Sequence, residues 1–153
     1  MNRAYLLSSA GKLIQVGAQT AVEYAEKADQ LIAAMNAHMM GRPDIEALVG
    51  ANNINMMKDN HANHVRFMAS IFVNHNPEVL VDTVLWVFRA YRSHAFTTNY
   101  WAAQLNGWMI ILKEKLSKET YEQVYPYYEW MQVNIPVFVK VSDEKLEGLN
   151  SMH

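Results

Sequence analysis

Hydrophobic positions along most of the chain recur every three or four residues, which is the period of an amphipathic helix. Such series cover residues 19–40, 54–74, 77–93 and 100–116. The series over 77–93 is apolar on most of its sides, which is typical of a helix at the centre of a fold. No segment alternates apolar and polar residues as a half-buried strand does. The pattern therefore predicts an all-helical protein.

Capping residues mark where several of these helices begin. Asn76 precedes Pro77, and this pair predicts an N-cap followed by proline at the first helical position. Thr98 or Asn99 can cap the helix over 100–116, and Ser117 can cap the segment that follows it. The polar residues therefore agree with the boundaries that the hydrophobic series indicate.

Glycine and proline divide the chain further. Gly41 and Pro43 end the first long series, and a short helical turn should follow them. Pro126 and Pro136 should kink or divide the last helical segment. We therefore predict an all-α, single-domain fold of five to seven helices over the whole chain, either a helical bundle or a globin-like arrangement. The end of the chain, residues 142–153, is polar and is expected to form a frayed tail.

Composition narrows the range of functions. The chain has 153 residues, of which 51% are hydrophobic and 18% charged, as expected for one folded domain. Its net charge of −2 gives no basic surface for a nucleic acid. The absence of cysteine excludes disulfides, thiolate nucleophiles, iron–sulfur clusters and covalently attached haem. No apolar run is long enough for a membrane span and no secretory signal is evident, so we expect a soluble cytoplasmic protein without membrane partners.

Three histidines and two methionines share the apolar stripe of the helix over 54–74 and its end. They are His61, His64 and His75, with Met57 and Met68 beside them. Imidazole and thioether groups suit haem iron, copper or zinc, so His61 and His64 are candidate metal ligands. The cofactor itself is not identified; haem or another tetrapyrrole, held without a covalent bond, is one class consistent with these ligands. In the other interpretation, the histidines are core residues that hydrogen-bond their neighbours.

Aromatic and basic side chains are densest between residues 86 and 101. Two arginines three positions apart can bind a carboxylate or phosphate together, and the rings can wall a planar ligand. In the other interpretation this is an aromatic helix corner whose arginines pair with nearby carboxylates. The candidate ligand-binding residues are Trp86, Arg89, Tyr91, Arg92, His94, Tyr100 and Trp101.

A second aromatic run covers residues 125–131. Because a helix points its residues in all directions, part of this run should be exposed as a patch that a protein partner or a second copy of the chain could cover. Alternatively, Tyr127 and Trp130 cover the helix over 100–116. The sequence leaves both interpretations open.

The stretch HVRFMASIFVNHNPEVLVDTVLWVFRAYRSHAFTTNYWAAQL, about residues 64–105, resembles the helical segment that adjoins cobalamin-binding domains in bacterial regulators. The shared pattern is a His-containing helix, an Asn-Pro start, an apolar helix with Trp, and an Arg-containing loop into another helix. The resemblance implies helices that sense or cap a corrinoid. The family's ligand signature, a Trp followed about ten residues later by Glu-His, is absent after Trp86 and Trp101, so its ligand residues are not carried over.

Three functions follow from these observations. The first is a non-enzymatic helical sensor or adaptor module that binds a small ligand or a protein partner, acting in signalling or regulation and forming a homodimer. The alternative is a haem- or soft-metal-binding bundle that uses His61 and His64 with Met57 and Met68. An enzyme acting on an anionic substrate through residues 89–94 comes last, because no nucleophile–base pair or phosphate loop is present.

Overall fold

The computed structural model describes the backbone of residues 1–151 and the side chains of residues 1–144. Over residues 1–151 the fold is all-helical, as predicted, but it has nine helices rather than five to seven. They are α1 (Arg3–Ala10), α2 (Ala18–Glu26), α3 (Ala28–Met40), α4 (Ile45–Val49), α5 (Ile54–Val73), α6 (Pro77–Arg92), α7 (Thr98–Lys115), α8 (Lys118–Val133) and α9 (Ile135–Ser151).

The higher number has two main causes. The series over 19–40 is one helix by its periodicity, but the backbone turns at Lys27, whose amine then reaches the carbonyl oxygen of Lys115 at the end of α7. The last segment divides at Asn134, and Pro136 takes the second position of α9, where proline costs no helical hydrogen bond. Pro126 lies inside α8 and does not divide it. Tertiary contacts therefore overrode local periodicity at residue 27.

The predicted caps at Asn76 and Ser117 are confirmed. The side chain of Asn76 accepts a hydrogen bond from the backbone N–H of Val79, and that of Ser117 accepts one from the N–H of Thr120. The prediction for α7 was wrong by one position, because Thr97 is the capping residue. Its hydroxyl also donates to the carbonyl oxygen of Leu48, which ties the start of α7 to α4.

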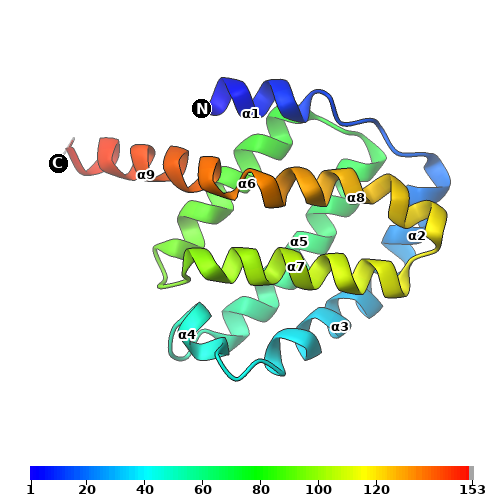
Figure 1. The fold of residues 1–153 in the computed structure, drawn as a ribbon, viewed down its shortest axis with the longest axis horizontal. Helices are drawn as coiled ribbons and strands as arrows, with labels where there is room; N and C mark the ends of the chain where they lie inside the picture. The colour runs from blue at the N-terminus through cyan, green and yellow to red at the C-terminus, as the bar shows by residue number, and fades with distance from the viewer. Residues whose placement is uncertain (152–153) are drawn as a thin grey trace.

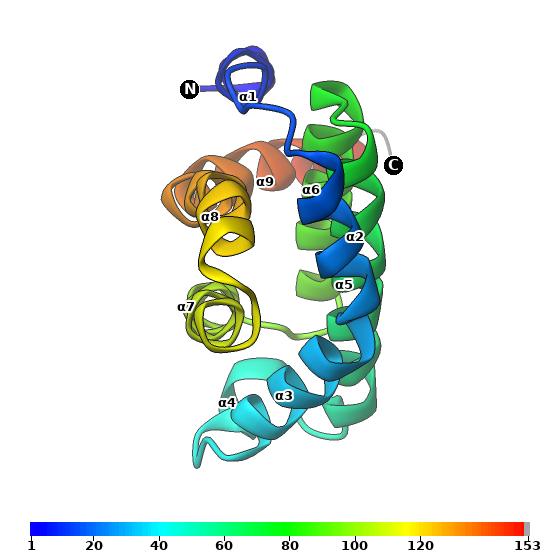
Figure 2. The ribbon, with the colours of Figure 1, turned by 90° about the vertical axis from the view of Figure 1, so that its right-hand side faces the viewer.

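The helices form two layers (Figures 1 and 2). One layer holds α2, α5 and α6, and the other holds α7, α8 and α9, as the side view shows. Contacts of α6 with α9 and of α2 with α8 join the layers, while α1 packs on α6 and α3 packs on both α5 and α7. The core lies between these layers.

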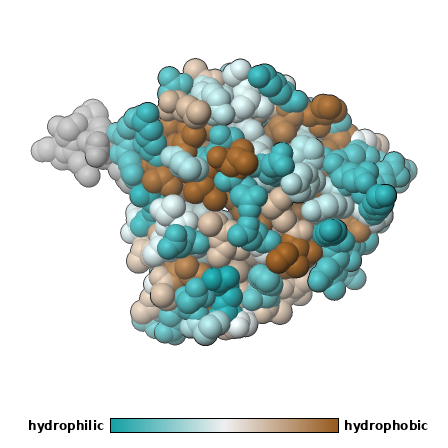
Figure 3. All heavy atoms as spheres, viewed as in Figure 1, coloured by the Kyte–Doolittle hydropathy of each residue, from teal (hydrophilic) through white to brown (hydrophobic). Residues whose placement is uncertain are grey.

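Most of the core comes from the predicted stripes. Trp101, Leu105, Trp108, Leu112 and Leu116 are all buried, as the spacing in α7 predicts. On the face shown in Figure 3, apolar and polar side chains are interspersed. None of the described helices combines the length and the apolar character that crossing a membrane needs.

The expected frayed tail, residues 142–153, falls within and beyond α9. The helix continues to Ser151, and Ser142 is buried with its hydroxyl donating to the carbonyl oxygen of Val139. Residues 152 and 153 lie outside the described part of the chain.

Candidate functional site

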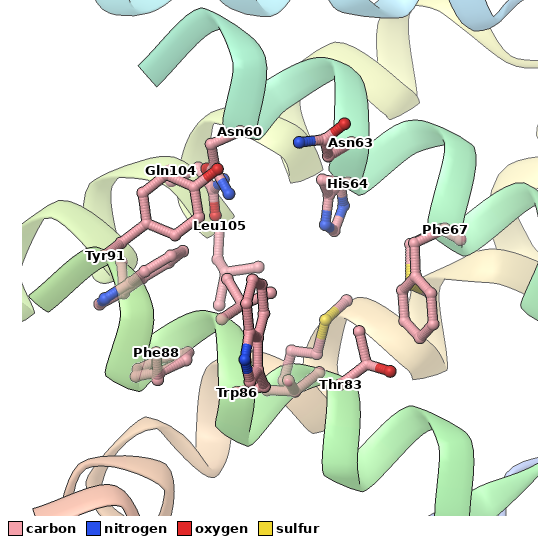
Figure 4. Close-up of a pocket in the computed structure, with 15 residues that line it drawn as sticks. Asn60, Asn63, His64, Phe67, Thr83, Trp86, Phe88, Tyr91, Gln104 and Leu105 are labelled. Atoms are coloured by element: carbon pink, nitrogen blue, oxygen red, sulfur yellow. The ribbon is translucent and has the colours of Figure 1, made fainter. Parts of the chain in front are cut away.

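A cavity lies between α5 and α6, two helices that are consecutive in the chain but pack against different neighbours. Residues 74–76 connect the two helices. Helix α5 packs on α2 and α3, whereas α6 packs on α1 and α9. The space between them is about 240 Å³ and is closed on a further side by α7. Figure 4 shows side chains of both helices pointing into it.

Fifteen residues from four helices line this cavity, and all of them are uncharged or histidine. Ten carry apolar or aromatic side chains, and the polar ones are three carboxamides, one threonine and one imidazole. The lining residues are Asn60, Asn63, His64, Phe67 and Met68 from α5; Thr83, Val84, Trp86, Val87, Phe88 and Tyr91 from α6; Trp101, Gln104 and Leu105 from α7; and Met131 from α8.

Trp86 and Phe67 stand apart on two sides of the cavity (Figure 4). The residue Trp86 is 58% exposed, which is unusual for a tryptophan, whereas Phe67 is partly buried against the core. Deeper in, Phe88 and Trp101 stack with ring centroids 4.5 Å apart, and this pair gives the cavity a rigid aromatic wall.

A network of amides fixes the polar end of the cavity. The side-chain oxygen of Asn60 accepts hydrogen bonds from the hydroxyl of Tyr100 at 2.8 Å and from Nε2 of Gln104 at 2.7 Å. Tyr91 interacts with the amides of Asn63 and Asn60, although burial outweighs this and raises the pKa of its hydroxyl. Since these groups are held by one another, their positions are set before any ligand binds.

His64 is the other polar group at this end. Its Nε2 shares a hydrogen bond of 2.8 Å with the hydroxyl of Tyr128, which in turn bonds the hydroxyl of Tyr24 at 2.7 Å. The imidazole stacks on Trp108 at 5.1 Å, and burial, with a smaller contribution from nearby His61, lowers the pKa of His64 to about 3. The ring is therefore neutral near pH 7, and its Nδ1 makes no hydrogen bond within the described part of the chain.

His61 lies one turn away on the same helix face, as predicted, but it does not line the cavity. Its Nδ1 donates to the amide oxygen of Asn36 at 2.7 Å, and burial lowers its pKa to about 4. Its Nε2 is buried without a partner among the described residues. His75, the third histidine of the stripe, shares a hydrogen bond of 2.9 Å between its Nε2 and the carbonyl oxygen of Ala10.

The four predicted haem or soft-metal ligands do not all share one site, because His64 and Met68 line the cavity whereas His61 and Met57 do not. Met57 and Met68 are fully buried, and no three His, Cys, Asp or Glu side chains within the described residues group as metal ligands do. An apolar cavity of about 150 Å³ holds one benzene ring. At 240 Å³ the present cavity is too small to enclose the four rings of a tetrapyrrole.

The structure brings together part of the predicted aromatic and basic corner. Trp86, Tyr91 and Trp101 line the cavity, and Tyr100 lies directly behind it, where it holds Asn60. These four residues come from two helices that the sequence places on either side of a turn.

The basic members of that corner lie elsewhere. Arg92 forms an ion pair with Asp143 of α9 at 2.8 Å, and Arg89 borders a neighbouring pocket with Arg3, Asp82 and Trp86. His94 is exposed in the turn after α6. The two arginines therefore do not converge on one anion, and neither lines the cavity.

Of the two interpretations that the sequence left open for residues 125–131, an exposed aromatic patch or burial, the structure favours burial for all of the rings except the half-buried Tyr125. Tyr127, Tyr128, Trp130 and Met131 are all buried. The hydroxyl of Tyr127 donates to the carbonyl oxygen of Ile14, and Nε1 of Trp130 donates to the hydroxyl of Ser9. The run is covered by the first segment of the chain, and this contact has no signature in the local pattern.

Sequence reasoning missed the cavity's amides and several of its apolar walls. Asn60 and Gln104 are both buried, and each occupies a position one helical turn from apolar stripe residues. A polar residue on an otherwise apolar face was the available signal, since a buried amide needs partners. Phe67 carried no such signal, because it resembles any other core residue.

Comparison of the chain with protein-family models, curated proteins and solved structures found no match of any of the three kinds.

Proposed function

We propose that this chain is a non-enzymatic helical sensor module that binds a small, mainly apolar molecule in the cavity between α5, α6 and α7. The observation that carries the proposal is the cavity itself, about 240 Å³ in volume and lined by side chains of four helices. Binding pockets are typically apolar concavities with a few fixed polar groups between the helices of a bundle. This cavity has that composition.

The chemistry of the lining favours binding over catalysis. General acid–base catalysis works best with a group whose pKa is near the working pH. The one imidazole in the lining is that of His64, whose pKa is lowered to about 3, and the lining has no carboxylate, amine or guanidinium. We therefore assign the cavity to ligand recognition.

A ligand in this position would touch two helices that belong to different parts of the fold. It would bridge α5, which packs on α2 and α3, and α6, which packs on α1 and α9. A ligand can shift a conformational equilibrium only if it binds one state better than the other. Bridging two helices that pack mainly on other neighbours provides such a difference, and this is the basis for assigning a sensor role.

The test compares ligand-induced stabilisation in two matched variants. Val87→Phe fills the cavity, because Val87 lines it, whereas Val79→Phe makes the same change on the same helix at a 45% exposed position outside it. We expect neutral compounds of one or two rings to raise the melting temperature of the wild-type protein and of Val79→Phe. A ligand at 100 times its Kd should add about 2.7 kcal/mol to the free energy of unfolding. The affinity of Val87→Phe for the same compounds, measured by isothermal titration calorimetry, should be at least tenfold weaker than that of the wild-type protein.

Two results would contradict the proposal. One is a compound panel in which nothing stabilises the wild-type protein. The other is equal stabilisation of both variants, which would place binding outside the cavity.

A further inference from the structure

We infer that the ligand of this cavity is a neutral, flat aromatic molecule of one or two rings that carries one hydroxyl-like polar group, bound with its ring between Trp86 and Phe67 and its polar group at His64. The inference rests on the proposed function and narrows it to a chemical class. Three features of the cavity carry it: its size and shape, the ring nitrogen of His64 that has no partner among the described residues, and the lack of charge in its lining.

Size and shape select a flat ring. A volume of about 240 Å³ is larger than the roughly 150 Å³ that holds benzene, and it leaves room for a second small ring or a substituent. Trp86 and Phe67 stand apart on two sides of the space that Figure 4 shows, and we place the planar ligand between them. The exposed fraction of Trp86, 58%, leaves a large ring surface that such a ligand would cover. Aromatic pairs add attraction beyond the burial of area, so a flat ring is favoured over a puckered one.

One end of the cavity offers a hydrogen bond that is not already used. Nε2 of His64 is occupied by the hydroxyl of Tyr128, whereas Nδ1 has no partner within the described residues and is not sealed from solvent. The side-chain oxygen of Asn60 accepts from both Tyr100 and Gln104, so this acceptor is already engaged. Because the tautomer of a neutral imidazole can differ, Nδ1 either donates or accepts. A ligand hydroxyl suits both cases, since it can also do either.

The lining also excludes charged ligands. None of the cavity residues is Asp, Glu, Lys or Arg, and the strong lowering of the pKa of His64 keeps its ring neutral. Neither arginine near this end of α6 lines the cavity: Arg92 pairs with Asp143, and Arg89 borders a neighbouring pocket that shares Trp86 with it. An ion moved into such a site loses its hydration without gaining a counter-charge. We therefore expect carboxylates and amines to bind far more weakly than neutral molecules of the same shape.

The experiment uses five small probes of similar size and the full chain. Phenol carries the ring and the hydroxyl, toluene lacks the hydroxyl, cyclohexanol lacks the flat ring, and benzoate and benzylammonium add a charge. Affinities are measured by calorimetry at neutral pH. We expect phenol to bind about 2- to 10-fold more tightly than cyclohexanol, which is the contribution of an aromatic pair. Benzoate and benzylammonium should bind at least tenfold more weakly than phenol.

Two variants separate the roles of the polar groups. His64→Leu should weaken phenol at least tenfold and leave toluene within about twofold, because the hydroxyl then has no partner in the buried end. His94→Leu is the matched control, since it makes the same change at an exposed histidine in the turn after α6 that does not line the cavity. It should change neither affinity by more than about twofold.

A measurement on the wild-type protein covers the case in which His64→Leu does not fold. Phenol, but not toluene, should shift the ¹⁵N resonance of Nδ1 of His64 in an imidazole-detected NMR spectrum. A shift of this resonance supports the assignment of the polar end, and its absence at saturating phenol overturns it.

The outcomes separate the two proposals. If neither toluene nor phenol binds, the proposed function fails together with this inference. If toluene and phenol bind in the cavity but benzoate binds as well as phenol, or cyclohexanol as well as phenol, the ligand class is wrong while the proposed function stands.

Discussion

The two sides of α5 differ in how completely they are packed. On one side Phe72 meets the rings of Tyr24 and Tyr127 edge to face, with centroid distances of 4.8 and 5.1 Å. We call these three residues and Tyr128 the ring cluster. On the other side Phe67 faces the cavity of about 240 Å³. One helix thus carries a tightly packed face and an incompletely filled one.

The difference follows from the neighbours of α5 and not from its own sequence. Each face carries a phenylalanine, but α2 and α8 close over one of them, while α6 diverges from the other. Every hydroxyl of the ring cluster has a hydrogen-bond partner, whereas Nδ1 of His64 on the cavity side has none among the described residues. Tight packing stabilises the fold, and incomplete packing leaves room for a ligand.

Truncation of Phe72 and Phe67 should give the largest difference in the free energy of unfolding between the two faces of α5. We expect Phe72→Ala to lower the free energy of unfolding by about 3–5 kcal/mol, because it removes a fully buried ring and leaves a cavity. Phe67→Ala should cost about 1 kcal/mol, since that ring is partly exposed and already borders empty space. Urea denaturation followed by far-UV circular dichroism measures both. Equal losses would mean that the two faces are packed alike.

Acidification tests the burial of His61 and His64, the two histidines of α5. The pKa values of His61 and His64 in the folded protein are lowered to about 4 and about 3, below the value of about 6.5 in an unfolded chain. The unfolded state therefore binds more protons below pH 6.5, and stability that is complete above this pH is lost as the pH falls. At pH 5 the loss should be about 2 kcal/mol for each histidine. Urea denaturation at pH 7, 6 and 5 measures it.

Two controls assign this loss to the histidines. His94→Gln should leave the loss in free energy of unfolding between pH 7 and pH 5 unchanged, because His94 is exposed. His61→Gln should remove about half of that loss. Burial alone would raise the pKa of Glu23, but hydrogen bonds from Ser117, Lys27 and Thr120 outweigh it and lower the pKa to about 2. The contribution of Glu23 is therefore lost only below pH 4.5, outside this range. A free energy of unfolding that stays constant from pH 7 to pH 5 would contradict burial of both rings.

The sequence predicted much of the fold because helix periodicity and capping are local. The ends of α5 and α6 and the cap at Asn76 lie where the pattern places them. The break at Lys27 could not be predicted, because it depends on a contact with the end of α7. The burial of residues 125–131 depends likewise on Ser9 and Ile14, more than a hundred positions away in the chain.

The site was predictable only in its aromatic part. Rings at Trp86, Tyr91 and Trp101 are visible in the sequence as a dense cluster, and they do meet at one cavity. The arginines lie in the same stretch of sequence as these rings, yet Arg92 forms an ion pair with Asp143 and does not line the cavity. A cavity arises where two helices diverge, and helix divergence is a property of the whole packing arrangement that no local spacing encodes.

The smallest effect that we predict tests whether the two faces are coupled. The hydroxyl of Tyr128 lies between Nε2 of His64 and the hydroxyl of Tyr24, and it thereby links the ring cluster to the cavity. Tyr128→Phe should cost about 2 kcal/mol in urea denaturation, because it leaves two buried polar groups without this partner, whereas Tyr24→Phe should cost about 1 kcal/mol because the bond to His64 remains. If the link positions His64, Tyr128→Phe should also weaken phenol binding in calorimetry, and Tyr24→Phe should not. Equal stability losses with unchanged phenol affinity would mean that the two faces of α5 act independently, and that the ring cluster serves the fold alone.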